Sequence, residues 1–265
     1  MDGILVDTTK CTGCEKCVVA CIEKNHLNLE KSYYDRVTSR DGLSADRWLS
    51  INKVSEGHFT RLSCMHCVDP ACVSACLVGA ITKTSEGPVI YDTSKCIGCR
   101  YCMLACPFHT PRYEWNAIKP FMRKCNMCYD RLQRNELPAC VAACPYEAII
   151  FGERNELLNR ARALIRSNPG KYLNHIWGEK EYGGTSVIYI SEVDLAGMGW
   201  HNEPSTPIPD FTQPLIEKTP EIGLTVGSVL VGLTWIIRRR MKLTGHTDQS
   251  GDNDKMKEKV QEDVR

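Results

Sequence analysis

Four cysteines near the middle of the chain have a spacing that suits metal-cluster chemistry. Cys96, Cys99, Cys102 and Cys106, with Pro107 directly after them, form the pattern C-x2-C-x2-C-x3-C-P. Three closely spaced thiolates can hold three corners of an iron–sulfur cubane, whereas the fourth, after a longer spacer and before a proline, points toward a different cluster. This run alone therefore predicts two iron–sulfur clusters.

The other cysteines of the chain are grouped in the same way. Disulfide frameworks occur mainly in small secreted domains, and structural zinc has no use for a third and a fourth cysteine in one short run. The grouping favours iron–sulfur clusters, with zinc as an alternative for the second and fourth groups. The chain of 265 residues has 16 cysteines in four groups with none left over: Cys11, Cys14, Cys17 and Cys21; Cys64, Cys67, Cys72 and Cys76; Cys96, Cys99, Cys102 and Cys106; Cys125, Cys128, Cys140 and Cys144.

Two internal repeats relate these groups to one another. The segment DTTKCTGC at Asp7–Cys14 recurs as DTSKCIGC at Asp92–Cys99, and PACVSAC at Pro70–Cys76 recurs as PACVAAC at Pro138–Cys144. Such self-similarity indicates repeated structural units. Each half of the region therefore carries two cysteine groups.

Several residues next to the cysteines have expected roles. Gly13 and Gly98 lie inside the ligand loops, where the absence of a Cβ lets the backbone curl closely around a cluster. His66 lies between Cys64 and Cys67, and we expect it to hydrogen-bond to backbone or cluster sulfur, because four thiolates already complete the ligand set. The basic residues near the groups either tune cluster potential or are ordinary surface charges, and both roles stay open: Lys10, Lys16, Lys95, Arg100, Arg123 and Lys124.

The pattern of apolar residues predicts the elements that position these loops. Alternation and apolar runs predict strands over 1–7, 48–54 and 186–190, and apolar residues at helical spacing predict an amphipathic helix over 153–167. We interpret residues 22–63 as an insertion with a structural or partner-contacting role. Residues 197–220 are rich in proline and glycine, which predicts an extended linker.

The chain continues into an uncharged apolar run. Ile222–Ile237 is followed by RRRMK at 238–242. A helix of that length spans about 24 Å, short of a hydrocarbon core of about 30 Å, but snorkelling arginines and the interfacial Trp235 make up the difference. We therefore favour a membrane anchor over a buried core helix. The positive-inside rule places the basic tail in the cytoplasm and the cluster region on the periplasmic side.

The rest of the sequence excludes several functional classes. A net charge of +1 gives no reason to expect nucleic-acid binding. The chain has no dinucleotide-binding glycine loop and no P-loop, and no Ser/His/Asp or paired-carboxylate arrangement stands out. We expect electron transfer without substrate chemistry of its own.

The four groups, their order and their spacers resemble a known family, the four-cluster ferredoxin-like electron-transfer subunits of membrane-bound respiratory oxidoreductases. The match covers residues 7–150, while Gly178–Thr185 (GEKEYGGT) and the apolar C-terminal run look most like the members that serve periplasm-facing nickel–iron hydrogenases and molybdenum or tungsten formate dehydrogenases. The resemblance implies an α+β fold of two interleaved bacterial-ferredoxin-like lobes and a C-terminal transmembrane helix. The implied domains are an outer lobe (1–21 and 120–152), the insertion (22–63), an inner lobe (64–119), an extension (153–196), the linker (197–220), the anchor (221–240) and a disordered charged tail (241–265).

The resemblance also implies the ligand sets and the function. Ile22 and Leu77 stand where the family usually has a proline, but the ligands remain. The implied function is electron relay through four [4Fe-4S] clusters between a catalytic subunit and a membrane quinone-reactive or cytochrome subunit. Alternatives are a cytoplasm-facing subunit of a dimethyl-sulfoxide-reductase-type molybdoenzyme and a zinc-stabilised scaffold. The ligands cross over between groups: Cys11, Cys14, Cys17 with Cys144; Cys125, Cys128, Cys140 with Cys21; Cys64, Cys67, Cys72 with Cys106; and Cys96, Cys99, Cys102 with Cys76.

The first residues of the chain bear on how the cluster region would reach the periplasm. The opening apolar run is too short for the core of a signal peptide, and it has no basic flank or twin arginine. We expect export of the folded chain with a partner that carries the signal.

Overall fold

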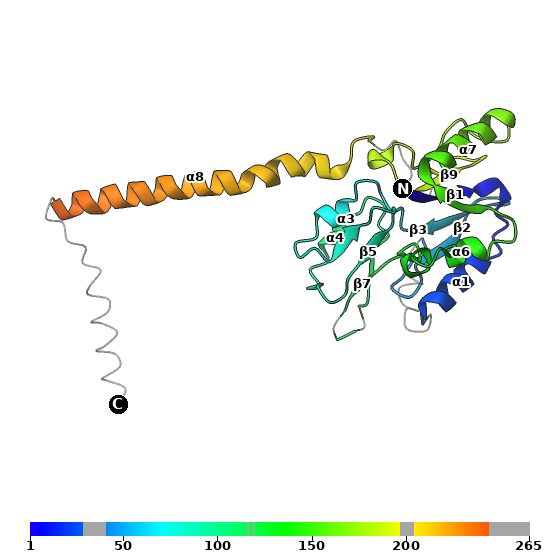
Figure 1. The fold of residues 1–265 in the computed structure, drawn as a ribbon, viewed down its shortest axis with the longest axis horizontal. Coiled ribbons are helices and arrows are strands. Elements are labelled where there is room, and N and C mark those ends of the chain that lie inside the picture. Colours follow the sequence, from blue (N-terminus) through cyan, green and yellow to red (C-terminus); the bar gives the residue numbers. More distant parts are fainter. Residues whose placement is uncertain (29–40, 116, 119, 197–203, 244–265) are drawn as a thin grey trace. The chain divides into compact units, whose positions relative to one another are not determined.

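The structure is a computed structural model, which describes residues 1–28, 41–115, 117–118, 120–196 and 204–243 (Figure 1). The chain divides into two units, Met1–Phe211 and Thr212–Arg265.

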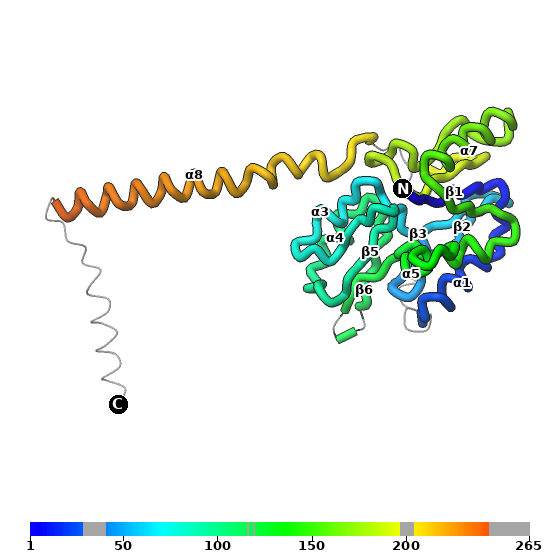
Figure 2. The backbone as a smooth tube through the Cα atoms, in the orientation of Figure 1, coloured from blue at the N-terminus to red at the C-terminus, as the bar shows by residue number. Residues whose placement is uncertain are grey.

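A three-stranded sheet lies at the centre of the first unit. Its middle strand β1 (Asp2–Asp7) pairs antiparallel with β8 (Ile149–Glu153) and parallel with β9 (Val187–Ile190). Residues 3–7 of β1 are all buried, because both neighbours and both faces of the strand are covered. The N-terminal strand β1 is therefore joined to strands from the second half of the cluster region and beyond it. Figure 2 labels β1 close to the N-terminus.

One face of this sheet is covered by helix α7 (Arg154–Ser167). Leu157, Leu158 and Ala161 of the helix pack against Leu5 and Ile188 of the sheet. The helix begins where the Glu153 carboxylate accepts a hydrogen bond from the backbone N–H of Glu156 at 3.0 Å, which satisfies one of the free N–H groups of its first turn.

The opposite face carries the largest apolar cluster. Ile4 and Val6 of β1 lie there with Val18, Leu49 and Met127. The elements around this cluster are η1 (Thr8–Lys10), α1 (Lys16–Asn25), the antiparallel hairpin of β2 (Leu49–Ser55) and β3 (His58–Ser63), α5 (Tyr129–Leu132) and α6 (Ala139–Ala142).

A smaller cluster organises the segment between the hairpin and residue 124. Cys72, Ile81, Val89, Tyr113 and Met122 form its buried centre. The elements around it are α3 (Ala71–Ser74), β4 (Ile81–Lys83), β5 (Val89–Tyr91), α4 (Tyr101–Ala105), β6 (Arg112–Tyr113) and β7 (Met122–Arg123), and η2 (Glu181–Gly183) follows later in the chain. The fold is thus a mixture of helices and sheets, as predicted.

The elements predicted from apolar patterning agree with the structure to within one or two residues. The strands predicted over 1–7, 48–54 and 186–190 are β1, β2 and β9, and the helix predicted over 153–167 is α7. These predictions are confirmed because each element buries one regular stripe or run of apolar side chains.

The second unit contains most of helix α8 (Ile208–Leu243), which is 36 residues long. An 18-residue window of this helix has a mean hydropathy of 1.6 and no buried residue, so its length and composition are sufficient to cross a membrane. The predicted anchor over 221–240 lies within it.

The linker prediction over 197–220 is wrong for residues 208–220, which are helical. Pro209 lies in the first turn, where its missing N–H costs no hydrogen bond. The helix continues through Pro214 and Pro220, although each removes one hydrogen bond of the ladder and its ring crowds the preceding turn. The helix also covers 241–243 of the predicted tail, while residues 197–203 and 244–265 lie outside the described residues.

Candidate iron–sulfur cluster sites

The first and last cysteine groups line two neighbouring cavities. Cys11, Cys14 and Cys17 line one cavity together with Cys144, and Arg61 also borders it. Cys11 and Cys14 lie on the loop before α1 and Cys17 lies in its first turn, and the pairing of β1 with β8 brings the distant Cys144 to them. The structure therefore places the predicted fourth thiol with the first group.

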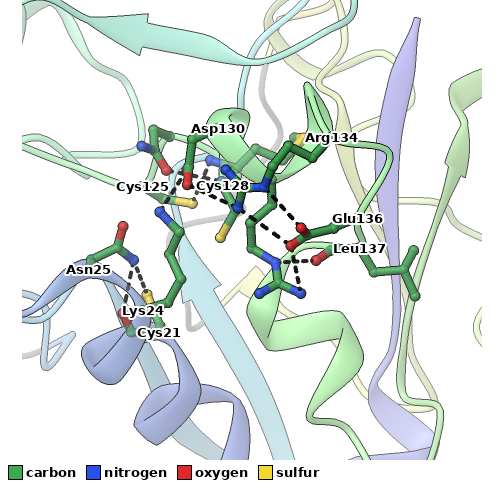
Figure 3. Close-up of polar contacts among 12 residues, drawn as sticks. Cys21, Lys24, Asn25, Cys125, Cys128, Asp130, Arg134, Glu136 and Leu137 are labelled. Carbon is green, nitrogen blue, oxygen red and sulfur yellow. Dashed lines mark hydrogen bonds and ion pairs between the residues drawn. The ribbon is translucent and has the colours of Figure 1, made fainter.

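The second cavity is lined by Cys125, Cys128, Cys140 and Cys21, again with Arg61. Figure 3 shows Cys21 on α1 facing the segment that carries Cys125 and Cys128. Next to them, Lys24 on α1 forms an ion pair with Asp130 on α5 at 2.6 Å, and Asn25 donates a hydrogen bond to Cys21 Sγ at 3.6 Å.

The two middle groups also come together in crossed sets. Burial raises the pKa of Cys67, and the nearby thiols of Cys106, Cys64 and Cys72 raise it further. In the same way, burial raises the pKa of Cys102 to about 11, with further increases from Cys76, Cys96 and Cys99. Cys67 and Cys102 thus each have three thiols of the expected set among their electrostatic neighbours.

Thiols of different sets also influence one another's pKa values at three places, and these electrostatic interactions connect the sets in a linear order. Cys140 of the second cavity raises the pKa of Cys17 in the first. Cys64 likewise raises the pKa of Cys125 in the second cavity. Cys102, in the set of Cys76, Cys96 and Cys99, raises the pKa of Cys72, which is in the set of Cys64. The two terminal sets each hold one exposed cysteine, Cys14 and Cys99.

The chemistry of these sets fits iron–sulfur clusters. Burial raises the pKa of Cys17, Cys72 and Cys125 to about 12 in each case, so the thiols stay protonated at neutral pH unless a cation compensates the thiolate charge. A cluster supplies that charge as iron, and ligated sulfur accepts hydrogen bonds. Backbone donors of this kind are present: Ala80 N–H to Cys76 Sγ at 3.1 Å, Met127 N–H to Cys125 Sγ at 3.3 Å, and Gly98 N–H to Cys96 Sγ at 3.4 Å.

Among the described residues, no three His, Cys, Asp or Glu side chains are arranged to hold a metal ion. Each cysteine of a cubane binds a different iron atom. Its thiolates therefore need not converge on one point, as the ligands of a tetrahedral zinc ion do.

The two predicted loop glycines have the conformation that requires glycine. Gly13 and Gly98 have φ values of +74° and +72°. A Cβ at Gly98 would lie 2.5 Å from Tyr113 Oη, and one at Gly13 would lie 2.8 Å from the ring of Phe59. An aromatic side chain behind each loop therefore demands glycine, a reason that local sequence does not reveal.

His66 hydrogen-bonds to the backbone, as predicted. Its Nδ1 accepts a hydrogen bond from the N–H of Val89 at 2.8 Å. Burial holds its pKa well below the usual value, and the nearby Lys124, Lys83 and Arg61 lower it further. The ring is therefore neutral at physiological pH.

The six basic residues differ in exposure, and Lys10 and Arg123 are half-buried. Lys16, Lys95 and Arg100 are exposed. Lys124 is buried, and its amino group donates hydrogen bonds to the carbonyls of Val89 and Cys125. Lys124 is therefore not an ordinary surface charge, which was one of the two roles expected for these basic residues.

Two further cations near the sites were not predicted from the sequence. Arg61 on β3 is 1% exposed, and Lys83 on β4 donates hydrogen bonds to the carbonyls of His66 and Gly87. A signal for Arg61 was available, because it is a charged residue in a strand three positions before Cys64.

Comparisons with known proteins place relatives of this chain among iron–sulfur proteins. Residues 55–154 match a family described as a 4Fe-4S dicluster domain. A protein of Nitratidesulfovibrio vulgaris is 40% identical over 251 residues, which cover 91% of this chain and 68% of that protein. The hydrogenase-2 operon protein HybA of Escherichia coli O157:H7 is 34% identical over 295 residues, with 95% and 88% covered. The B subunit of the anaerobic dimethyl sulfoxide reductase of Escherichia coli K12 is 40% identical over 171 residues, with 63% and 80% covered.

Proposed function

Because this chain belongs to the family of 4Fe-4S iron–sulfur subunits of respiratory oxidoreductases, we propose that it holds four [4Fe-4S] clusters and relays electrons along them. The sixteen cysteines supply four ligands for each of the four clusters. The ligand sets are the crossed ones: Cys11, Cys14, Cys17 and Cys144; Cys21, Cys125, Cys128 and Cys140; Cys64, Cys67, Cys72 and Cys106; Cys76, Cys96, Cys99 and Cys102.

The linear order of the sets carries this proposal. Three electrostatic interactions between thiols support this order, those of Cys17 with Cys140, Cys125 with Cys64 and Cys72 with Cys102. Electrons that enter at one terminal set can therefore pass through every cluster to the other. The exposure of Cys14 and Cys99 supports this path, because it leaves each terminal cluster accessible to a partner.

The proposed division into two ferredoxin-like lobes is supported by a strand pairing and by a separate apolar cluster. The antiparallel pairing of β1 with β8 supports an outer lobe built from 1–21 and 120–152. The separate apolar cluster around Ile81 and Val89 supports an inner lobe over 64–119. On this division each lobe encloses two clusters.

The proposed partners are a catalytic subunit of nickel–iron hydrogenase or formate dehydrogenase type and a quinone-reactive or cytochrome subunit in the membrane. The names of the relatives support a catalytic partner, since they include a hydrogenase-2 operon protein and the iron–sulfur subunit of a nitrate-inducible formate dehydrogenase. The apolar helix α8 and the basic residues at its end support a single membrane span with the clusters in the periplasm.

One observation favours a second candidate. The B subunit of dimethyl sulfoxide reductase is as similar in identity as any relative described above, so the chain could instead serve a molybdoenzyme from the cytoplasm. Thiol labelling of a cysteine introduced at Glu56, which is 96% exposed and outside the ligand sets, separates the two in intact spheroplasts: labelling from the outer face supports the periplasmic location, and protection contradicts it.

The function is tested on the complex purified anaerobically with its partners. Native mass spectrometry of this subunit counts clusters from the mass added to the chain, and four cubanes contribute about 16 iron atoms and about 16 sulfides. Two clusters per chain would contradict the relay. Measuring nickel, molybdenum and tungsten in the same sample identifies the class of catalytic partner.

A further inference from the structure

Strand β3 brings a single positive charge between the two cavities formed by the first and last cysteine groups. Arg61 is 1% exposed and borders both cavities. Its Nη2 lies 3.7 Å from Cys140 Sγ, close enough to donate a weak hydrogen bond to the sulfur. One side chain therefore reaches two proposed clusters.

The remaining donors of Arg61 have no hydrogen-bond partner. Its Nε and Nη1 are both buried and unpaired in the described part of the chain. A buried guanidinium without a carboxylate is unfavourable unless other anions compensate its charge. The ionisable groups facing it are the thiols of Cys140, Cys125 and Cys17 and the hydroxyl of Tyr189, and although burial alone lowers the pKa of Arg61, these groups raise it overall.

The buried Lys124 and the half-buried Lys83 differ from Arg61 in this respect. The amino group of Lys124 donates to the carbonyls of Val89 and Cys125. Lys83 donates to two carbonyls and to the hydroxyl of Ser186. Both lysines donate their hydrogen bonds to groups of the protein. By contrast, Nε and Nη1 of Arg61 remain available to hydrogen-bond to a cluster bound in either cavity.

We propose that Arg61 is a positioning residue shared by the clusters of Cys11, Cys14, Cys17 and Cys144 and of Cys21, Cys125, Cys128 and Cys140, and that it raises the reduction potential of both. The inference rests on the proposed clusters. Arg61 donates N–H groups to their sulfurs, and its charge stabilises the reduced form, because each one-electron reduction adds one negative charge beside it. The insertion between Cys21 and Cys64 thereby acquires a role, since its hairpin delivers this charge.

The test is a redox titration of the intact complex, followed by EPR, with the cluster count checked by native mass spectrometry. Arg61→Gln keeps a hydrogen-bond donor and removes the charge. We expect four clusters, two of which become at least tenfold harder to reduce, equivalent to about 59 mV for a one-electron couple. Arg61→Lys, which keeps the charge, should restore most of that loss.

Lys95→Gln is the matched control, because Lys95 also stands next to a cysteine group but is 58% exposed. It should leave the two affected potentials unchanged. A fully loaded Arg61→Gln with four unaltered potentials, or with only one altered, would overturn the inference. If Arg61→Gln does not load, Arg61→Lys decides: unchanged potentials support a charge role, and two lowered potentials refute it. A wild-type chain with fewer than four clusters would instead refute the proposed function.

Discussion

The two copies of the repeat at Asp7–Cys14 and Asp92–Cys99 have the same local geometry in different surroundings. In each copy the aspartate accepts hydrogen bonds from the N–H and the hydroxyl of the residue two positions later, Thr9 or Ser94. In each copy the loop glycine has a positive φ, +74° in the first and +72° in the second. The ligand loops are therefore determined by the repeat itself.

Their surroundings come from other parts of the chain. The first repeat continues the central strand of the three-stranded sheet and leads into α1, which has 10 residues. The second follows a strand with one partner and leads into α4, which has 5 residues. Around the second repeat, Ile97, Tyr101 and Leu104 are 64%, 55% and 81% exposed. Because solvent access and nearby charge set the potential of a cluster, two equal loops are expected to hold unequal clusters.

The largest difference is expected when the distant fourth thiol of each copy is removed. Cys144→Ser removes a thiol from the cavity beside the central sheet, which belongs to the first copy. Cys76→Ser removes the corresponding thiol from the second copy, whose surroundings are more exposed. Each should cost one cluster, about four iron atoms. The first should also lower Tm by on the order of 10 °C, because breaking a buried charge set is expensive, and the second by less than half of that.

Differential scanning calorimetry of the two variants, with cluster counts, makes this comparison. Equal losses of Tm would show that the sheet around the first repeat adds no stability to its cluster. A larger loss for Cys76→Ser would reverse the comparison.

A smaller difference is expected for the two aspartates. Asp7 is 1% exposed and also accepts a hydrogen bond from Tyr172 Oη at 3.0 Å, whereas Asp92 is exposed beside Lys95. Asp7→Ala should cost about 1.5–3 kcal/mol, the range for a hydrogen bond to a buried charged group, and Asp92→Ala should cost less. Thermal unfolding of both variants measures the difference in free energy of unfolding. Tyr172→Phe measures how much of the Asp7 effect comes from the hydrogen bond of Tyr172. The account is wrong if Asp92→Ala is the more damaging change.

The parts of the molecule that were predictable from sequence are those that depend on local pattern. Cysteine spacing defined the four groups, and regular apolar stripes defined β1 and α7. The role of Arg61 was not predictable, because its burial results from a hairpin inserted between cavities whose walls come from both ends of the cysteine region. The crossed ligand sets came from the resemblance, since local spacing does not say which distant thiol completes each set.

The smallest effect is expected from the exposed edge of the first repeat's helix. Lys24 and Asp130 form an ion pair at 2.6 Å with side chains that are 19% and 47% exposed. Lys24→Ala should lower the free energy of unfolding by only about 0.2–1 kcal/mol, because solvent screens such pairs. Unfolding at low and high salt checks this, with Lys53→Ala as an exposed control of a pair on the β2–β3 hairpin. A loss that persists in high salt would mean that Lys24 acts through packing.

The most direct test of the linear four-cluster account is Cys106→Ser. Cys106 follows Cys96, Cys99 and Cys102 in sequence, but its thiol lies with Cys64, Cys67 and Cys72. The EPR spectrum of the reduced Cys106→Ser complex should therefore lose the same cluster signal as Cys67→Ser and keep the signal that Cys99→Ser removes. A spectrum that matches Cys99→Ser instead would contradict the crossed sets, and with them the order of the relay.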